Sequence, residues 1–208
     1  MFKLKKMPKK NFTLLCLSLI MSMLIFLQSD VPSETEIQAS KQISFEKEYE
    51  DQLNNFVFLM KIASFLDHTD LHSTASGMII SSTNSHVFIL TAHHFCVSEE
   101  TDFVKTEILA HNNNLPRATH IVYTDEVNDI CLLTGIKYKN EKFKNLKLAK
   151  KMPAIGNFVF NVSAPNSMGS PNTRLLFDGH FGGCEEICVY TIPATFGSSG
   201  SAVFNSKG

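Results

Sequence analysis

Residues 90–94 read Leu-Thr-Ala-His-His, and they end an apolar run that begins at Val87. Two further stretches join polar residues to an apolar run: residues 128–133 read Asn-Asp-Ile-Cys-Leu-Leu, and residues 197–204 read Gly-Ser-Ser-Gly-Ser-Ala-Val-Phe. Short apolar runs bounded by turn residues are typical of β-strands. In this order the three stretches offer a histidine as general base, an aspartate to orient it and a serine as nucleophile.

The same pattern of short apolar runs continues along the chain from Phe56 onwards, and the sequence of this region predicts no long amphipathic helix. Residues 82–85, Ser-Thr-Asn-Ser, connect two of the runs as a hairpin turn. The sequence therefore predicts an all-β domain over residues 56–208, built as a barrel or a sandwich. The expected strands are residues 56–62, 77–81, 86–91, 104–110, 120–124, 130–133, 157–162, 174–177, 188–192 and 202–204.

The charge balance argues against one class of partner. The 208 residues carry 20 acidic and 19 basic side chains, and the lysines are spread along the chain. A nucleic-acid-binding domain is expected to gather its basic residues on one face or along one helix. We therefore expect no nucleic-acid partner.

The N-terminus has the composition of a targeting segment. Five lysines between residues 3 and 10 precede an uncharged, largely apolar stretch over residues 12–27. This arrangement is typical of secretory signals and signal anchors, and it predicts that the following chain is exported. No small-residue pair of the Ala-x-Ala kind follows Phe26, so residues 1–29 are either a signal peptide or an uncleaved anchor. Polar residues 30–55 are expected to form a stalk or linker, and the domain to be periplasmic or extracellular, secreted or held at the membrane.

The three stretches resemble, in the same order, the three signatures of trypsin-like serine peptidases of the chymotrypsin fold. The resemblance covers residues 56–208 and is strongest to compact bacterial and phage members of the HtrA-like and glutamyl-endopeptidase-like groups. Residues 77–80, Gly-Met-Ile-Ile, lie upstream where the first-barrel hairpin of that family is required. The resemblance implies two six-stranded antiparallel β-barrels of the chymotrypsin type. The second barrel is expected to be truncated at the C-terminus, because only nine residues follow Ser199.

The resemblance also implies an activity. The chain is expected to be a serine endopeptidase that hydrolyses protein or peptide substrates through an acyl-enzyme intermediate, with no metal and no cofactor. A competing hypothesis is a catalytically inactive, membrane-tethered binding module on the same fold, and a third is a viral or phage processing protease. Sequence downstream of residue 208 and the neighbouring genes would distinguish these hypotheses.

Two adjacent histidines compete for the role of base. The family motif places the base three residues after its threonine, which selects His94 and leaves His93 structural or solvent-facing. Two neighbouring side chains on an extended backbone cannot both enter one site. A His-His metal site is the alternative, but carboxylates or cysteines at ligand spacing are not evident beside it.

The candidate orienting acid is Asp129. It directly precedes an apolar strand, where it can be partly buried and accept the imidazole N–H. Its rival, Asp125, has the sequence context of a solvated turn residue. A strand-capping acid with no chemical role is the alternative interpretation of Asp129.

The candidate nucleophile is Ser199, because it has the frame Gly-x-Ser-Gly that Ser198 and Ser201 lack. Gly197 permits backbone geometry that is closed to other residues and brings an N–H close to the substrate. The N–H groups of Gly197 and Ser199 are therefore expected to form the oxyanion hole. A serine-rich turn without chemical meaning is the alternative.

The resemblance gives only a partial indication of specificity. Pro193 stands six residues before the nucleophile, where this family often has the floor of its specificity pocket. His180 is a second pocket candidate, with an ordinary loop histidine as the alternative. Position 193 has no acidic side chain that could bind a Lys or Arg of the substrate. The resemblance therefore favours an uncharged substrate side chain.

Four cysteines follow the leader, and they allow three complete pairings. Cys184 and Cys188 are close enough in sequence for a small-loop disulfide in an oxidising compartment. Cys131 lies in the middle of an apolar run and is expected to be a small buried core residue. Cys96 lacks the partner that the resemblance would place before Gly77.

Overall fold

The computed structural model describes residues 49–65, 70–97, 103–112, 115–165 and 174–208. These ranges belong to one compact unit, which extends from Glu48 to Gly208. The predicted leader over residues 1–29 and most of the predicted stalk over residues 30–55 lie outside the described residues. Among the described residues, no helix is long and apolar enough to span a membrane.

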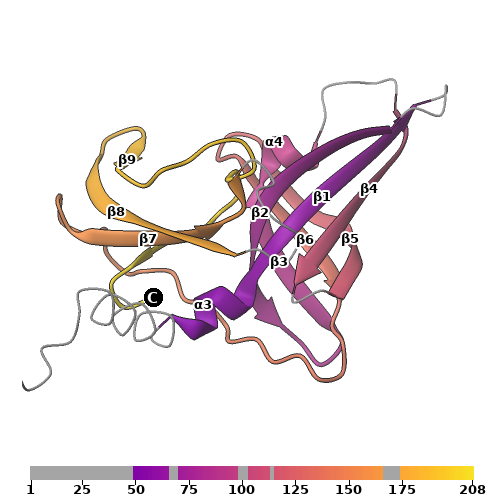
Figure 1. Cartoon of the computed structure of the whole chain (residues 1–208), viewed down its shortest axis with the longest axis horizontal. Coiled ribbons are helices and arrows are strands. Elements are labelled where there is room, and N and C mark those ends of the chain that lie inside the picture. The colour runs from indigo at the N-terminus through magenta and orange to yellow at the C-terminus, as the bar shows by residue number, and fades with distance from the viewer. Residues whose placement is uncertain (1–48, 66–69, 98–102, 113–114, 166–173) are drawn as a thin grey trace, which may run out of the picture. The chain divides into compact units, whose positions relative to one another are not determined.

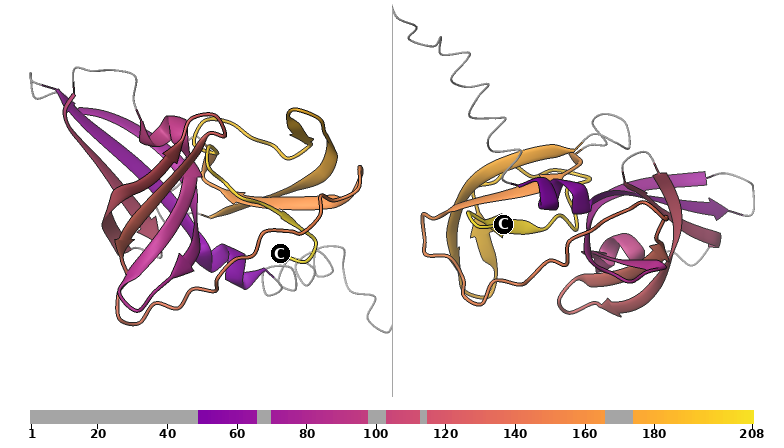
Figure 2. Two further views of the ribbon diagram at one scale, coloured as in Figure 1. Left: turned by 180° about the vertical axis from the view of Figure 1, so that it is seen from behind. Right: turned by 90° about the horizontal axis from the view of Figure 1, so that it is seen from below.

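Six strands form a closed antiparallel barrel in the first part of this unit (Figure 1). The strand order is β1-β2-β3-β6-β5-β4, and the pairing of β1 with β4 closes the barrel. In the right-hand view of Figure 2 the barrel strands surround a common interior. Closure gives each of these strands two neighbours, so the barrel has no edge strand. The strands are β1 (Phe56–Phe65), β2 (Asp70–Ser82), β3 (His86–Ala92), β4 (Phe103–Asn112), β5 (Leu115–Asp125) and β6 (Ile130–Ile136).

Alternating burial explains how these strands share one core. On β3, Val87 and Ile89 are completely buried, while Phe88 and Leu90 are only partly buried. Successive side chains of a strand point to opposite faces, so one apolar set lines the interior. The core cluster of the barrel contains Val57, Leu59, Ala75, Ile79, Val87, Ile89, Phe95, Cys96, Ile108, Ala110, Cys131 and Leu133.

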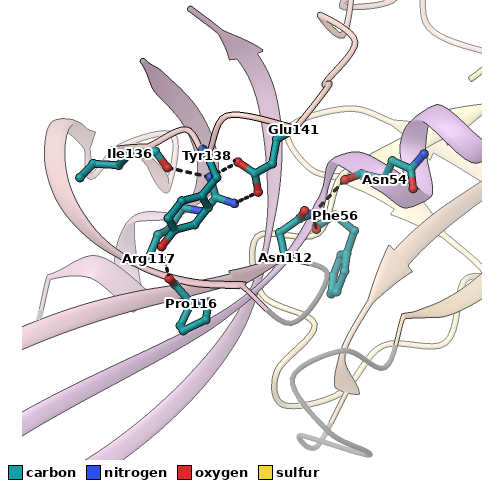
Figure 3. Close-up of polar contacts among 8 residues, drawn as sticks. All are labelled: Asn54, Phe56, Asn112, Pro116, Arg117, Ile136, Tyr138 and Glu141. Atoms are coloured by element: carbon teal, nitrogen blue, oxygen red, sulfur yellow. Dashed lines mark hydrogen bonds and ion pairs between the residues drawn. The ribbon is translucent and has the colours of Figure 1, made fainter. Parts of the chain in front are cut away.

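A buried ion pair connects β5 to the segment that follows β6 (Figure 3). The side chains of Arg117 on β5 and Glu141 after β6 are 1% and 10% exposed. The Arg117 guanidinium donates to the Glu141 carboxylate and, at 2.9 Å, to the Ile136 carbonyl. The Tyr138 ring lies 5.2 Å from the guanidinium, and its hydroxyl donates to the Pro116 carbonyl at 2.6 Å. These contacts fix the first part of the connection to the second sheet.

Helix α3 (Glu50–Asn55) leads directly into β1 and is bound to the barrel. The side-chain amide of Asn112 on β4 donates to the carbonyl groups of Asn54 and Phe56 at 2.9 and 2.6 Å (Figure 3). Because these carbonyls lie on either side of the helix end, the amide fixes the junction between α3 and β1.

The second part of the unit is a four-stranded sheet. Its strands are β7 (Phe158–Ser163), β8 (Leu175–Cys184), β9 (Cys188–Tyr190) and β10 (Val203–Asn205), in the order β10-β7-β8-β9. The expectation of a second barrel therefore holds only in part, because the described residues form an unclosed sheet. Closure requires that the two edge strands pair, whereas β9 and β10 each have one neighbouring strand in the described structure.

Each of the ten predicted strands corresponds to one strand of the structure. Several strands extend well beyond the predicted ranges, and the largest extensions are in β2, β5 and β8. The first three residues of β2 are exposed, and they are held by backbone pairing with β1 rather than by a buried apolar face. Pairing of this kind leaves no hydrophobic periodicity for a sequence to reveal.

An apolar cluster joins the barrel to the sheet. Phe56, Phe58 and Met78 from the barrel are buried together with Val162 and Ala164, which lie in and directly after β7. The partly buried residues that pack against this cluster are Leu53, Met60, Leu146, Leu176, Ala202 and Phe204. The sheet therefore rests on the outer face of β1 and β2.

Candidate active site

Helix α4 (His93–Cys96) follows β3 directly and brings His94 next to Asp129, the last residue before β6. The Nδ1 atom of His94 lies 3.0 and 2.8 Å from the two carboxylate oxygens of Asp129. The backbone N–H of His94 donates to the same carboxylate at 2.9 Å, and the N–H of His93 donates to the Asp129 carbonyl at 3.1 Å. The backbone and the side chain of Asp129 therefore both hold α4 in place.

Asp129 has a backbone conformation that is uncommon for a residue with a side chain. Its φ is 52°, in the left-handed region where Asp and Asn are enriched. It ends the turn over residues 126–129 that joins β5 to β6, and its N–H donates to the Glu126 carbonyl at 3.3 Å. Conformations of this kind persist where the surroundings determine them, and here the contacts with α4 do so.

Opposing effects set the pKa of the Asp129 carboxyl. Burial raises this pKa, whereas the backbone N–H of His94, the His94 imidazole and the N–H of His93 lower it, and the result lies below the ordinary value of 3.8. The carboxylate is therefore ionised at neutral pH and can only accept hydrogen bonds. It follows that Nδ1 of His94 carries a hydrogen and donates it to Asp129.

Ser199, the third predicted residue, lies beside the other nitrogen of the His94 imidazole. Ser199 Oγ lies 3.0 Å from His94 Nε2. In a neutral imidazole with hydrogen on Nδ1, Nε2 is an acceptor, so the Ser199 hydroxyl donates to it. The side chains of His94 and Asp129 are 59% and 51% exposed, so this chain of hydrogen bonds is open to solvent.

The rival residues lie outside this chain of hydrogen bonds. His93 and His94 stand in a short helix and not on the extended backbone that the sequence predicted. Successive helical side chains are turned by about 100°, so the two imidazoles still point in different directions. The Asp125 carboxylate accepts hydrogen bonds from the Asn128 N–H and side-chain amide, at 3.1 and 2.7 Å. In the described ranges, no group of three His, Cys, Asp or Glu residues could hold a metal ion.

Two glycines shape the loop that carries Ser199. Gly197 and Gly200 have φ values of 88° and 79°, which a residue with a Cβ rarely adopts. A Cβ on Gly200 would overlap the Thr91 Oγ1 atom and the Ser76 carbonyl oxygen. Glycine at this position therefore lets the loop approach β2 and β3 closely enough for Ser199 to reach His94.

The sequence matches the family described as trypsin-like peptidase domain over residues 75–208. The chain belongs to the trypsin-like peptidase family. Among solved structures, this trypsin-like domain is similar to the serine endoprotease from Yersinia pestis, with 19% sequence identity and a TM-score of 0.59. The match covers 86% of this chain and 56% of that chain, so this chain spans little more than half the length of that protein. At this identity the likeness shows the fold alone. No curated protein matches the sequence.

A cavity of about 760 Å³ opens beside Ser199 in the trypsin-like domain. No charged side chain is among its lining residues, which are Asn161, Cys188, Val189, Tyr190, Ile192, Ala194, Thr195, Phe196, Ser198, Ser199, Ser201 and Val203. Pro193 is exposed and does not line this cavity, although both of its neighbours do. His180 lies exposed on β8, where its N–H donates to Thr191 Oγ1 at 2.8 Å, and it does not line the cavity either.

The structure pairs Cys184 with Cys188 and Cys96 with Cys131. Cys131 is completely buried, but it is not the free core cysteine that the sequence predicted. Local sequence could not reveal this bond, because it depends on the register in which Thr91 of β3 pairs with Cys131 of β6. The bond joins positions two residues beyond His94 and Asp129.

Sequence reasoning missed Ser76 on β2, which contacts the loop that carries Ser199, the candidate nucleophile loop. The residue is completely buried, and its hydroxyl donates to the Gly197 carbonyl at 2.8 Å. Its position directly before the run 77–80 was the available signal, because that run was already assigned to the first hairpin. A single serine in such a context indicates no partner by itself.

Proposed function

We propose that this trypsin-like domain is a serine endopeptidase with His94, Asp129 and Ser199 as its catalytic residues. The observation that carries the proposal is the position of the His94 imidazole, whose nitrogens lie 2.8 Å from an Asp129 oxygen and 3.0 Å from Ser199 Oγ. In acylation, Ser199 Oγ bonds to the substrate carbonyl carbon while His94 Nε2 takes the hydroxyl proton. Nε2 then gives the proton to the leaving amine as the C–N bond breaks, and water hydrolyses the acyl-enzyme by the same route.

Asp129 acts through the imidazole. Its lowered pKa keeps the carboxylate ionised, so it stabilises the imidazolium that forms when His94 takes the proton. Its hydrogen bond to Nδ1 also holds the tautomer in which Nε2 is free to act as base. The role assigned to Asp129 is therefore orientation and charge stabilisation, and the proton stays on the imidazole.

The N–H groups of Gly197 and Ser199 are the proposed oxyanion donors. Within the described residues, neither group donates a hydrogen bond to another part of the chain. Donors that are already in place stabilise the developing negative charge without reorganisation, and loss of one such donor lowers kcat by about 10²–10³.

The substrates we propose are proteins or peptides with an uncharged side chain at the position before the cleaved bond. The support for this preference is the cavity beside Ser199, whose lining lacks a charged residue. A lysine or glutamate side chain would lose its hydration there without gaining an ionic partner.

We further propose that the domain works outside the cytoplasm, after export directed by residues 1–29. Two disulfides support this location, because disulfides persist in oxidising compartments. Fractionation of expressing cells tests the proposal, with recovery in the periplasm, medium or membrane expected. Recovery of the whole chain in the cytoplasm with four free thiols would contradict it.

A second candidate function is a catalytically inactive binding module tethered to a membrane. The observations in its favour are that the described residues of the second sheet do not close into a barrel and that the side chain of His94 is more than half exposed. Such a module would fold and bind peptides without forming an acyl-enzyme.

Labelling with a fluorophosphonate probe separates the two candidates. The full chain should react at Ser199, and Ser199→Ala and His94→Ala should both abolish labelling, while His93→Ala serves as the matched control and keeps it. Absence of labelling in a chain that circular dichroism shows to be folded would overturn the enzyme proposal and favour the binding module.

A further inference from the structure

Ser76 lies on β2 beneath the nucleophile loop, and all of its polar groups are engaged. Its hydroxyl donates to the Gly197 carbonyl at 2.8 Å and accepts from the Ala164 N–H at 3.0 Å. Its N–H donates to the Ser199 carbonyl at 2.9 Å, and its carbonyl accepts from Thr91 Oγ1 at 2.8 Å. The residue has no exposed surface. One barrel residue thus contacts the loop on both sides of the Ser198–Ser199 peptide.

The loop needs such a contact because its own residues do not determine its shape. Gly197 and Gly200 permit positive φ, but glycine permits many other conformations equally well. The hydrogen bonds within the loop are those of turns, from the Ser198 N–H to the Thr195 carbonyl and from the Ser201 N–H to the Ser198 carbonyl, each at 3.0 Å. Holding the carbonyls of residues 197 and 199 fixes the peptide planes that bracket the Ser199 N–H.

Ser76 also connects the loop to the strand that leads to His94. Thr91, which donates to the Ser76 carbonyl, is buried three residues before His94. In β3 it pairs with Cys131, two residues after Asp129. A continuous series of contacts therefore runs from the nucleophile loop through Ser76 and Thr91 to the segments that carry the other two candidate catalytic residues.

We propose that Ser76 is a positioning residue whose hydroxyl sets the nucleophile loop against the barrel, so that Ser199 Oγ and the Ser199 N–H face the same substrate carbonyl. This inference rests on the proposed peptidase function. Ser76 touches neither the substrate nor the reacting atoms, and it acts through the two carbonyls that it holds.

The chain offers a matched control in Ser163 on β7. Ser163 is also completely buried, but its hydroxyl has no hydrogen-bond partner in the described structure. Ser163→Ala removes a buried hydroxyl without removing a hydrogen bond, whereas Ser76→Ala removes two. A difference between the two variants thus reports the hydrogen bonds of Ser76 and not the loss of a buried oxygen.

The test measures fluorophosphonate labelling rates and peptide hydrolysis in the full chain. Ser76→Ala should lower the labelling rate and kcat by about tenfold or more, with KM changed little, because loss of an oxyanion donor itself lowers kcat by about 10²–10³. Ser163→Ala should stay within about threefold of the parent, since its hydroxyl makes no bond. Equal rates in the two variants would overturn the proposal.

A second pair of variants guards against misfolding of Ser76→Ala. Thr and Val have nearly the same shape, but only Ser76→Thr keeps the hydroxyl, so it should label faster than Ser76→Val. If both variants fold and label at equal rates, the Ser76 hydroxyl does not position the loop.

Hydrogen exchange provides a readout that is independent of activity. The amides of residues 197–200 should exchange faster in Ser76→Ala than in Ser163→Ala, and unchanged exchange would contradict the proposal. If the parent chain does not label at all, the peptidase function fails, while the exchange rates still decide whether Ser76 holds the loop.

Discussion

The closed barrel and the unclosed sheet hold their parts of the candidate site in different ways. In the barrel, His94 and Asp129 stand on elements that hydrogen bonds and a disulfide join to each other. In the sheet, β9 and β10 each pair with one strand among the described residues, and Ser199 lies in a loop before a three-residue strand. The barrel holds this loop in place through the hydrogen bonds of Ser76 and the close approach of Gly200.

The two halves of the candidate site therefore differ in what supports them. The proposed base and the proposed orienting acid are held by the fold of one closed barrel. The position of the proposed nucleophile, Ser199, depends on the contact between the barrel and the sheet. Changes inside the barrel should therefore affect stability first, and changes at the contact should affect reactivity first.

The largest effect on stability is expected from the buried ion pair of the barrel. Glu141→Ala leaves the buried Arg117 guanidinium without its carboxylate, and such a loss destabilises by about 3–5 kcal/mol. Glu107→Ala is the matched control on β4, because its ion pair with Lys105 is exposed and is worth about 0–1 kcal/mol. Urea unfolding measures both, and equal free-energy losses would contradict the role given to the Arg117 pair.

The two disulfides allow a direct comparison of the barrel with the sheet. Cys96 and Cys131 are 35 residues apart, and Cys184 and Cys188 are 4 residues apart. Loop-closure entropy predicts that replacing the first pair by serine destabilises by about 4 kcal/mol, and the second by about 2 kcal/mol. Thermal unfolding of the two double variants checks the order. A larger loss from the Cys184–Cys188 variant would contradict the expectation that the barrel disulfide contributes more to stability.

Two glycines of similar backbone conformation differ in how closely they approach other atoms. Gly200→Ala combines a strained φ with overlap against Thr91 and Ser76, and we expect a loss of about 2–5 kcal/mol together with slower labelling. Gly156→Ala has a similar φ of 84°, but its Cβ would meet no atom within 4 Å, so only about 1–2 kcal/mol is expected. Similar losses, with labelling unaffected in both, would show that the loop does not need its close approach to the barrel.

The smallest effect concerns pH. The folded pKa of Asp129 lies below its ordinary 3.8, because hydrogen bonds from His94 and His93 outweigh the effect of burial. The unfolded chain therefore binds more protons in this range, so the contribution is present above the ordinary pKa and is lost as pH falls through the lowered one. The stability difference between the parent and Asp129→Asn should be constant above about pH 5 and shrink below about pH 4. A difference that does not change down to about pH 2 would be inconsistent with this ionisation.

The sequence predicted what depends on local patterns. The apolar run from Val87 to Leu90 indicated β3, and the flanking polar residues indicated His94, Asp129 and Ser199, which the structure brings within hydrogen-bonding distance. It missed what depends on register between distant strands. The bond from Cys96 to Cys131 and the contacts of Ser76 join residues that no periodicity relates.

The pairing of the strands in the second sheet was also beyond prediction. The strands of the sheet were each expected, but which of them pair is decided by contacts such as Val203 with Asn161, far apart in the chain. The cavity lining is a further example, because it gathers residues from β7, β9, β10 and the nucleophile loop.

Detection of an acyl-enzyme would test the proposed catalytic role of Ser199. A peptide ester with an uncharged residue at the cleaved bond should release a burst of about one leaving group per chain, because deacylation follows acylation as a separate step. Mass spectrometry of the acid-quenched chain should then find the acyl group on Ser199. No burst and no adduct, in a chain whose hydrogen exchange shows a folded barrel and an ordered nucleophile loop, would contradict the proposal that His94, Asp129 and Ser199 form a working catalytic triad.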